Sequence, residues 1–329
     1  MRSPAGHFER NVGKVKRKRV KKTQMNKKRS AFSGKIGYVL SAAGASVGLG
    51  NIWRFPYLAA KYGGGIFLLV YIILALTFGY TMIVAESALG RMTRKSPVGA
   101  FRSFAKGKKV GWLSFGGWIN AIIPVLIVPY YSVIGGWVVK YLFEYIRGNG
   151  SKLAEDGYFS GFISNGGATE ICFVIFCMFT LVIIYAGVQN GIERVSKIMM
   201  PILIILSVII AIYSVTRPGA FEGVKYFLVP NPANFSWMTV VAAMGQMFYS
   251  LSIAMGILVT FGSYMKKDIS IEDSTRNVEV FDTAIAIMAG LMIIPAVFAF
   301  SGGDPDTLQA GPSLMFITIP KVFASMGLG

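Results

Sequence analysis

The sequence predicts an all-α polytopic membrane protein in which two of the membrane-spanning helices are interrupted. Hydrophobic residues make up 54% of the 329 residues, and they gather in long apolar runs. A run of about 20 such residues is enough to cross the hydrocarbon core of a bilayer. We expect spans at residues 36–60, 65–89, 112–145, 171–187, 199–215, 237–264 and 280–300. The first and the sixth of these runs contain glycine and polar residues near their middle, which weaken a helix at that point.

The first span contains the sequence SAAGASVGLGNIWRFPY at residues 41–57. Its glycines weaken the helix, and Pro56 cannot donate a backbone hydrogen bond. Asn51 and Arg54 are polar at membrane depth, where polar residues are rare and usually functional. Unwound backbone at this depth is tolerated only where it lines a cavity or is buried in protein, and its free carbonyls can then bind a cation. The alternative is that the glycines only permit close packing of helices.

The sixth span contains Gln246, Ser250 and Ser252 in a stretch rich in small residues. Serine hydroxyls in membrane helices often bond to their own backbone, so this pattern alone is weak evidence of a site. The position of the span is stronger evidence. Paired interruptions at corresponding positions of two halves are typical of the binding site of a transporter, and these two spans stand five apart.

The charge distribution predicts the side of the membrane on which the N-terminus lies. The net charge is +18, and residues 1–30 are rich in Lys and Arg. A basic run can bind nucleic acid, but beside a membrane span we interpret it as a cytoplasmic tail attracted to anionic lipid. We therefore expect the lipid bilayer and no nucleic acid as a partner. Loops 91–110, 188–198 and 266–278 then lie in the cytoplasm, and the less basic loops 147–170 and 217–236 lie outside, in a multi-pass protein of the inner (cytoplasmic) membrane.

The cysteine and histidine content argues against redox or metal chemistry. Cys172 and Cys177 stand five positions apart in one span, where they face different directions, so we expect no disulfide between them. His7 is the single histidine and belongs to the basic tail, and no group of residues has metal-ligand spacing. We expect no enzymatic activity and no catalytic residues.

Three further polar residues in the spans each have two interpretations. Glu86 either reaches the interface or accepts hydrogen bonds from amides exposed where a neighbouring helix unwinds. Tyr131 either packs its ring and bonds its hydroxyl locally or hydrogen-bonds a ligand. Asp282 stands among apolar residues just beyond a loop, where a lone carboxylate is costly unless it is paired or binds a cation.

Three motifs carry a resemblance to a known family. They are GLGNIWRFP at residues 48–56, GRMTRKSPVGAF at 90–101 and GIER at 191–194. With them, the chain from about Arg29 to its last residue resembles the neurotransmitter:sodium symporter family, in its bacterial amino-acid transporter branch. The resemblance implies an inverted-repeat fold, in which five spans are followed by five more that are related by a pseudo-two-fold axis in the membrane plane. It also implies sodium-coupled import of a small substrate by alternating access.

The resemblance implies a domain organisation as well. Residues 1–30 would be the basic tail, 31–215 the first five-helix repeat, 216–236 an extracellular loop, 237–300 the first two helices of the second repeat, and 301–329 an extracellular loop with short helices. We then expect the second repeat to be truncated and the chain to be C-terminally incomplete. A truncated, transport-inactive family member and a substrate-binding membrane sensor are the alternatives to a symporter.

Positions that match the family's motifs imply the site residues. The substrate would contact Ala45, Ser46, Leu49, Gly50, Ile127, Tyr131, Tyr249, Ser250, Ser252 and Met255. The gates would be formed by Arg29, Arg54, Gln246 and Glu86. The first of two expected sodium sites would use Ser46, Asn51, Ser250 and Asp282. The second would use Gly44 and Val47, and it is expected to be incomplete because its other ligands belong to an eighth span.

Departures from the family's pattern refine these expectations. Monoamine transporters of the family carry Asp at the position of Gly48, so a substrate that brings its own carboxylate is favoured here. Many members carry Asn at the position of Asp282, and the fixed negative charge predicts that chloride is not required. Phe32 and Lys35 replace the usual Trp and Arg before the first span. The apolar end of the pocket, with its adaptable Met255, favours a neutral, hydrophobic or aromatic L-amino acid. The resemblance leaves a homodimer open.

Overall fold

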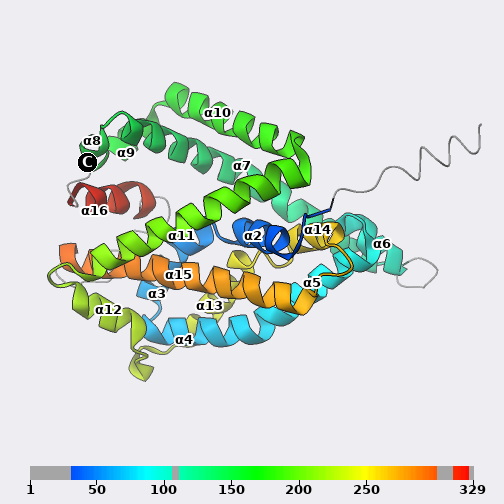
Figure 1. Ribbon diagram of the computed structural model, residues 1–329. Helices are drawn as coiled ribbons and strands as arrows, with labels where there is room; N and C mark the ends of the chain where they lie inside the picture. Colours follow the sequence, from blue (N-terminus) through cyan, green and yellow to red (C-terminus); the bar gives the residue numbers. More distant parts are fainter. Residues whose placement is uncertain (1–30, 106–110, 302–313, 326–329) are drawn as a thin grey trace, which may run out of the picture.

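The computed structural model describes residues 31–105, 111–301 and 314–325, and within these ranges every regular element is a helix. The long helices lie across one another in a bundle, with α2 near its centre and α15 and α11 running past it (Figure 1). Arg29 and the rest of the basic tail lie outside the described residues.

The prediction that the first span is interrupted is confirmed. Helix α2 runs over Lys35–Ser46, and the next residue, Val47, has an extended backbone. The span resumes as a π-helical turn, η1, over Gly50–Arg54, and continues as α3 over Phe55–Lys61. Pro56 stands in the first turn of α3, where a missing backbone donor costs least.

The sixth span is interrupted in the same way. Helix α13 covers Trp237–Ser250 and α14 covers Ile257–Tyr264, and residues 251–256 between them form turns. Ser252 and Ala254 have φ angles of 55° and 62°, in the left-handed region that non-glycine residues rarely adopt. Each such residue costs on the order of 1–3 kcal/mol and persists only where the surroundings impose it.

Five other helices are long and apolar enough to cross a membrane, by length and composition, among the described residues. One of them is continuous through α4, a second π turn called η2, and α5; another joins the π turn η3 to α11. Their bounds are α4 Gly65–Leu74, η2 Ala75–Gly79, α5 Tyr80–Thr93, α7 Leu113–Ile146, α10 Gly166–Tyr185, η3 Val188–Glu193, α11 Arg194–Val215 and α15 Ile271–Ser301.

Two expected loops were wrong in their bounds. Residues 188–198, predicted as a loop, are helical as η3 and the start of α11. The loop predicted at 266–278 ends early, because α15 begins at Ile271 with Glu272 and Asp273 in its first turn. Acidic residues stabilise a helix N-terminus, but they lower the apolar content by which a span is recognised. Asp282 therefore lies in the fourth turn of a helix and not at its beginning.

Short helices connect the spans. The segment predicted as loop 216–236 contains the helix α12, which packs against α15, and the last described stretch forms a π turn followed by α16. Their bounds are α6 Pro97–Ala105, α8 Gly150–Leu153, α9 Tyr158–Ser164, α12 Ala220–Leu228, η4 Pro232–Asn234, η6 Leu314–Thr318 and α16 Ile319–Ser325. Tyr141 of α7 donates a hydrogen bond to the Phe316 carbonyl at 2.9 Å, which holds η6 on the bundle.

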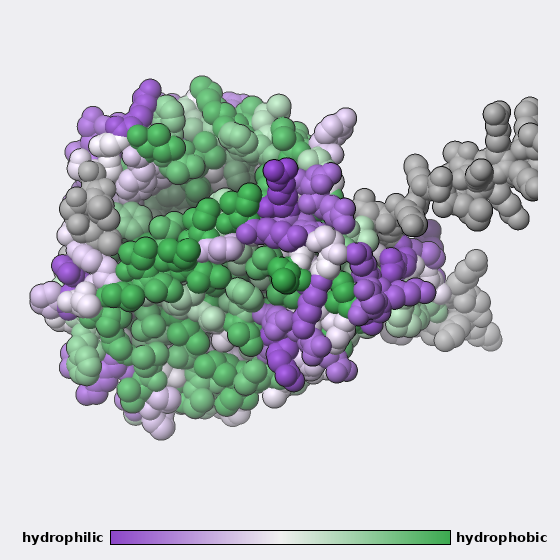
Figure 2. All heavy atoms as spheres, in the orientation of Figure 1, coloured by the Kyte–Doolittle hydropathy of each residue, from purple (hydrophilic) through white to green (hydrophobic). Residues whose placement is uncertain are grey.

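The outer surface of the bundle is apolar. Large hydrophobic side chains on α7, α10 and α11 are well exposed, among them Leu126, Phe179 and Ile212. Figure 2 shows this hydrophobic surface across the middle of the molecule, with hydrophilic residues gathered toward its ends. Such an arrangement suits a helix bundle with its apolar belt in a bilayer and its polar ends in water.

Helices α5 and α14 approach each other so closely that glycine is required where they touch. A methyl group added at Gly90 would collide with the Val259 carbonyl, and one added at Gly262 would collide with the Ser87 carbonyl. Small residues of this kind let the backbones of membrane helices come into contact. The second half of the broken sixth span is thereby fixed to α5.

We predict that Gly90→Ala lowers the stability of the protein. Overpacking of a close contact costs about 1–3 kcal/mol, because backbone and not a flexible side chain must move. The measurement is thermal unfolding of the purified protein in detergent. Gly161→Ala in α9 is the matched control, since its new methyl group meets nothing within 4 Å. Equal unfolding temperatures for the two variants would contradict the prediction.

Candidate functional site

The carboxylate of Asp282 is fully buried and lies where the two interrupted spans meet. Asn51 donates to it from η1 at 2.9 Å, and Ser250 donates from the end of α13 at 3.0 and 2.8 Å. Tyr71 of α4 is the third donor, with a bond of 3.1 Å. One acid on α15 thus connects the first, second and sixth spans.

The breaks in the helices place these donors. Asn51 is the second residue of the π turn, and its amide oxygen accepts a bond of 3.3 Å from the Gly48 backbone. Its amide nitrogen also donates to the Asp282 carbonyl at 3.1 Å. Ser250 is the last residue of α13, at the point where that helix unwinds. A regular helix through either break would carry these side chains in other directions.

The residues around Asp282 fit a small hard cation. The hydrogen-bonding partners of this carboxylate are neutral, so its charge is not balanced by them, and a buried charge is costly without a counter-ion. Carboxylate, amide and hydroxyl oxygens and freed carbonyls are the groups that hold sodium at broken helices. Ser46, 6% exposed at the end of α2, has a hydroxyl with no hydrogen-bond partner among the described residues, so a polar ligand would be favoured there.

A second polar group lies beside the first break. Gln246 donates to the Gly50 carbonyl at 2.8 Å, and the Tyr249 hydroxyl donates to that of Tyr131 at 3.0 Å. The guanidinium of Arg54 stands over the Tyr249 ring, 4.8 Å from its centroid. The predicted gate residues Arg54 and Gln246 therefore both contact the tyrosine pair or its neighbours, together with the predicted substrate residues Gly50, Tyr131 and Tyr249.

Glu86 does not belong to that group. Its carboxylate accepts a hydrogen bond of 2.7 Å from the backbone of Ala254, inside the broken part of the sixth span. Of its two interpretations, the structure thus shows the bond to an exposed amide. The structure does not bring Glu86 together with the predicted gate residues Arg54 and Gln246. From α5, Glu86 instead stabilises the break in the sixth span, because an unwound amide in an apolar medium needs an acceptor.

The other predicted residues surround the breaks with fewer polar contacts. The Ala45 carbonyl accepts a bond of 3.3 Å from Ser252. Leu49 packs against the main hydrophobic core, and Val47 belongs to a smaller cluster with Met200 and Ile285. Gly44 faces Ser196 and Met200 of α11. Ile127 and Met255 are partly buried, on α7 and in the sixth-span break.

The sequence interpretation missed Tyr71. It stands in a strongly apolar span, is fully buried, and bonds directly to Asp282. The signal that singled out Tyr131, a tyrosine in the middle of a span, applies to Tyr71 as well, because a buried tyrosine hydroxyl usually finds a partner. What the sequence does not contain is the identity of that partner.

These features define a class of protein: a polytopic helical membrane protein whose two broken spans meet around a buried carboxylate. A crystal structure of MhsT in complex with L-phenylalanine has the same fold, with a TM-score of 0.82 and 39% identity, covering 91% of this chain and 67% of that one. The uncharacterized sodium-dependent transporter YhdH of Bacillus subtilis is 36% identical over 301 residues, which are 91% of this chain. The sodium- and chloride-dependent GABA transporter 2 of Homo sapiens is 28% identical over an alignment of 344 positions, which covers 89% of this chain and 55% of that one.

The chain belongs to the sodium:neurotransmitter symporter family, whose model matches residues 29–151 and 158–329. This is a family of transporters and not of enzymes, and the family expected from the sequence motifs is confirmed. The chain spans 65% of the length of YhdH, 62% of that of a relative from Methanocaldococcus jannaschii and 55% of that of the human GABA transporter 2, so between about half and two thirds of the length of these relatives.

We predict that Glu86→Ala loosens the broken part of the sixth span. A lost hydrogen bond to a charged acceptor costs about 1.5–3 kcal/mol, so the amides of residues 251–256 should exchange with solvent roughly tenfold faster or more. Hydrogen exchange followed by mass spectrometry measures this directly. Glu86→Gln keeps an acceptor oxygen and should retain most of the protection. Unchanged exchange in Glu86→Ala would show that the segment does not depend on this carboxylate.

Proposed function

We propose that the protein serves sodium-coupled symport of a neutral, hydrophobic or aromatic L-amino acid by alternating access. The observation that carries the proposal is the contact of Asp282 with Asn51 and Ser250, since it joins both broken spans at one buried negative charge. Family membership and the sodium-dependent relatives support the coupling ion.

Sodium would bind next to Asp282. We assign Ser46, Asn51, Ser250 and Asp282 as its ligands, with Ser46 contributing through its carbonyl. Gly44 and Val47 would contribute carbonyls to a second sodium site, whose other ligands are expected outside the residues described here. A carboxylate fixed at position 282 supplies the negative charge locally, and for this reason we propose that chloride is not required.

The amino acid would bind between the two breaks. A methyl group added at Gly48 would point at the Tyr131 hydroxyl from 4.0 Å, so the glycine leaves open the space beside this donor. Tyr131 and the amides near Leu49 and Gly50 would hold the substrate carboxylate, helped by the positive end of the half-helix that begins there. Ala45, Ile127, Ser252 and Met255 would contact the side chain. The MhsT structure, which holds L-phenylalanine, supports an apolar side chain.

Coupling follows if the substrate carboxylate completes the first sodium site. Each ligand then raises the affinity for the other by the same factor, because coupling free energies are reciprocal. Arg54, Gln246 and the tyrosine pair would close the pocket on one side. We place that side outside the cell and the N-terminus in the cytoplasm. The loops expected on the same side of the membrane as the N-terminus carry most of the basic loop residues.

The proposal predicts sodium-dependent binding that is lost in Asp282→Ala and in Asn51→Ala. Removing one partner of a buried charged group costs about 3–5 kcal/mol, so affinity should fall by a factor on the order of 100 or more. Equilibrium binding of labelled L-phenylalanine to purified protein measures it, first in sodium and then with sodium replaced by potassium. Replacing chloride by gluconate should leave binding unchanged.

Asp268→Ala is the matched control, because Asp268 is an exposed acid in the loop before α15. It should bind like the unaltered protein. Competition with L-lysine and L-glutamate tests the substrate class, and strong preference for either would refute an apolar pocket. Binding that is equal in sodium and potassium would refute sodium coupling.

A further inference from the structure

We propose that a further sodium ion binds between α2 and α15, one helical turn from Asp282. Its ligands are Glu279 and Thr275 of α15 and Ser41 of α2. This position goes beyond the proposed function, which assigns sodium next to Asp282 and at the carbonyls near the end of α2. It rests on that function in taking sodium as the ion.

Glu279 is a second buried acid in the span that carries Asp282. It is 3% exposed, Asp282 is fully buried, and a separation of three residues puts the two carboxylates on one face of α15. The two acids interact electrostatically, and Oε1 of Glu279 has no hydrogen-bond partner among the described residues. Two buried negative charges this close destabilise each other unless one takes up a proton or a cation lies beside them.

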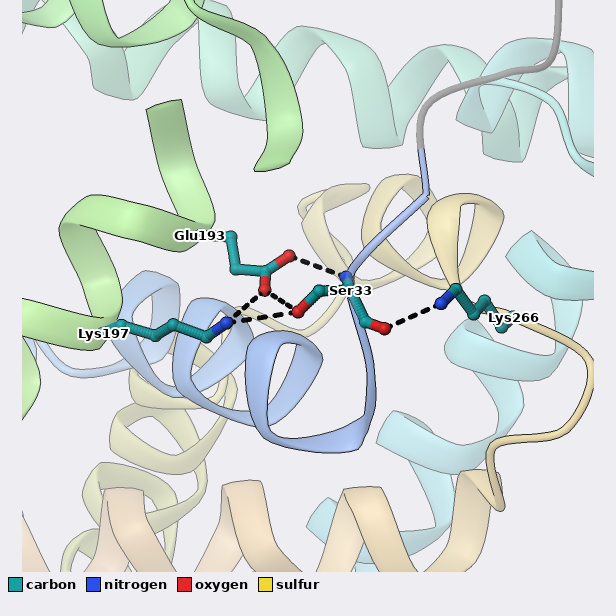
Figure 3. A network of polar contacts seen from close by, with 4 residues as sticks. All are labelled: Ser33, Glu193, Lys197 and Lys266. Atoms are coloured by element: carbon teal, nitrogen blue, oxygen red, sulfur yellow. Dashed lines mark hydrogen bonds and ion pairs between the residues drawn. The ribbon is translucent and has the colours of Figure 1, made fainter. Parts of the chain in front are cut away.

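A buried glutamate elsewhere in the protein shows how such a charge is balanced. Glu193, the last residue of η3, is 2% exposed, and Lys197 donates to its Oε1 at 2.6 Å (Figure 3). Ser33 donates to its Oε2 from the backbone at 2.9 Å, and Lys266 donates to the Ser33 carbonyl at 2.7 Å. The buried glutamate of α15 has no such cation. Arg276, the basic residue near it, is exposed and forms no ion pair with it in the described part of the chain.

Ion pairing at the start of α2 and α15 places Ser41 at the level of Glu279. Lys35, the first residue of α2, forms an ion pair of 3.8 Å with Asp273 in the first turn of α15. Ser41 stands six residues after Lys35, and Glu279 stands six residues after Asp273. Each is therefore about 9 Å along its helix from the paired ends.

The apolar contacts between the two helices agree with this register. Val278 belongs to one hydrophobic cluster with Tyr38, and Ile285, about two turns further along α15, belongs to another with Val47. The contacts follow the same order along both helices, so α2 and α15 run in the same direction. Ser41 lies between Tyr38 and Val47, and its level therefore corresponds to the part of α15 that holds the two acids.

The two hydroxyls of the proposed site also have no partner. A threonine in a helix commonly donates to the carbonyl four residues earlier, as Thr93 and Thr180 do here at 2.8 and 3.0 Å. Thr275 stands one turn before Glu279 and is 1% exposed, as Ser41 is, yet neither hydroxyl has a hydrogen-bond partner among the residues described. Buried polar groups without a partner indicate a bound water or ion.

A sodium ion satisfies these groups together. Hard cations take carboxylate and hydroxyl oxygens as ligands, and one positive charge offsets the charge of the second acid. The same kinds of oxygen form the sodium site proposed next to Asp282, where the Ser46 hydroxyl is likewise without a partner among the described residues. The proposal therefore adds one ion to those of the two sites already proposed.

The test counts the sodium ions that the purified protein binds. Equilibrium dialysis against radioactive sodium is carried out in detergent at saturating sodium, without an amino acid. Glu279→Gln keeps the shape of the side chain and removes its charge, and it should bind one ion fewer per molecule than the unaltered protein. A purely electrostatic influence on the site at Asp282 would change the affinity for sodium but not the number of ions at saturation.

The two hydroxyls are tested by their effect on affinity. Thr275→Val and Ser41→Ala should each weaken binding of this ion by about tenfold, as expected for a lost contact between a hydroxyl and a charged group. The matched controls are Glu272→Gln, at an exposed acid in the first turn of α15, and Thr180→Val, at a hydroxyl that already has a backbone partner. Both should bind sodium like the unaltered protein.

Asn51→Ala distinguishes this proposal from the proposed function, because Asn51 is assigned to the first sodium site only. Glu279→Gln should still lose one ion in the Asn51→Ala background. If Asn51→Ala alone loses no ion while Glu279→Gln loses one, the first site is wrong and the site at Glu279 is supported. If Glu279→Gln binds as many ions as the unaltered protein, Glu279 holds a proton or water, and the proposal is overturned. Unchanged affinity in both Thr275→Val and Ser41→Ala would also overturn it, because the ion would then lie elsewhere.

Discussion

The structure depends on one constraint: backbone that leaves a helix inside an apolar medium must find polar partners within the protein. At the first break Gln246 donates to the Gly50 carbonyl, which also accepts a bond from the Phe55 backbone, and Asn51 accepts from the Gly48 amide. At the second break Glu86 accepts from a freed amide. Gln246 of the sixth span reaches the first break, and Glu86 of α5 reaches the second, so each break has a polar partner on a neighbouring span. The two interruptions are parts of a single polar structure around Asp282.

Charge and close packing make this polar structure specific. Asp282 is reached by three neutral donors from three spans, which fixes their mutual positions but leaves its charge uncompensated. The glycine contacts between α5 and α14 hold the second break against the helix that carries Glu86. Fixed oxygen positions and a negative charge that no neighbouring cation balances are the two features that the proposed sodium site requires.

Much of this could be predicted from the sequence, and the rest could not for physical reasons. Glycine, proline and polar residues in apolar runs indicate broken helices, so both breaks were predictable, and family motifs indicated Asn51 and Asp282. The start of α15 was placed too late, because its acidic first turn resembles a loop in composition. The bond of Tyr71 to Asp282 and the bonds of Ser33 to Glu193 and Lys266 were missed. Each depends on which helices become neighbours, and apolar periodicity contains no information about individual partners.

The π turn η2 has a consequence for the way in which the sixth span could move. Its first half, α13, packs against α4, and its second half, α14, packs against α5. Because α4 and α5 form one continuous helix, that helix holds α13 and α14 in place and opposes a hinge motion between them. Its own irregular point is η2, where Gly79 lies against Leu251 and Met247 of the sixth span. Bending would thus be concentrated where η2 lies beside the break at residues 251–256, and the second and sixth spans would bend together at this level.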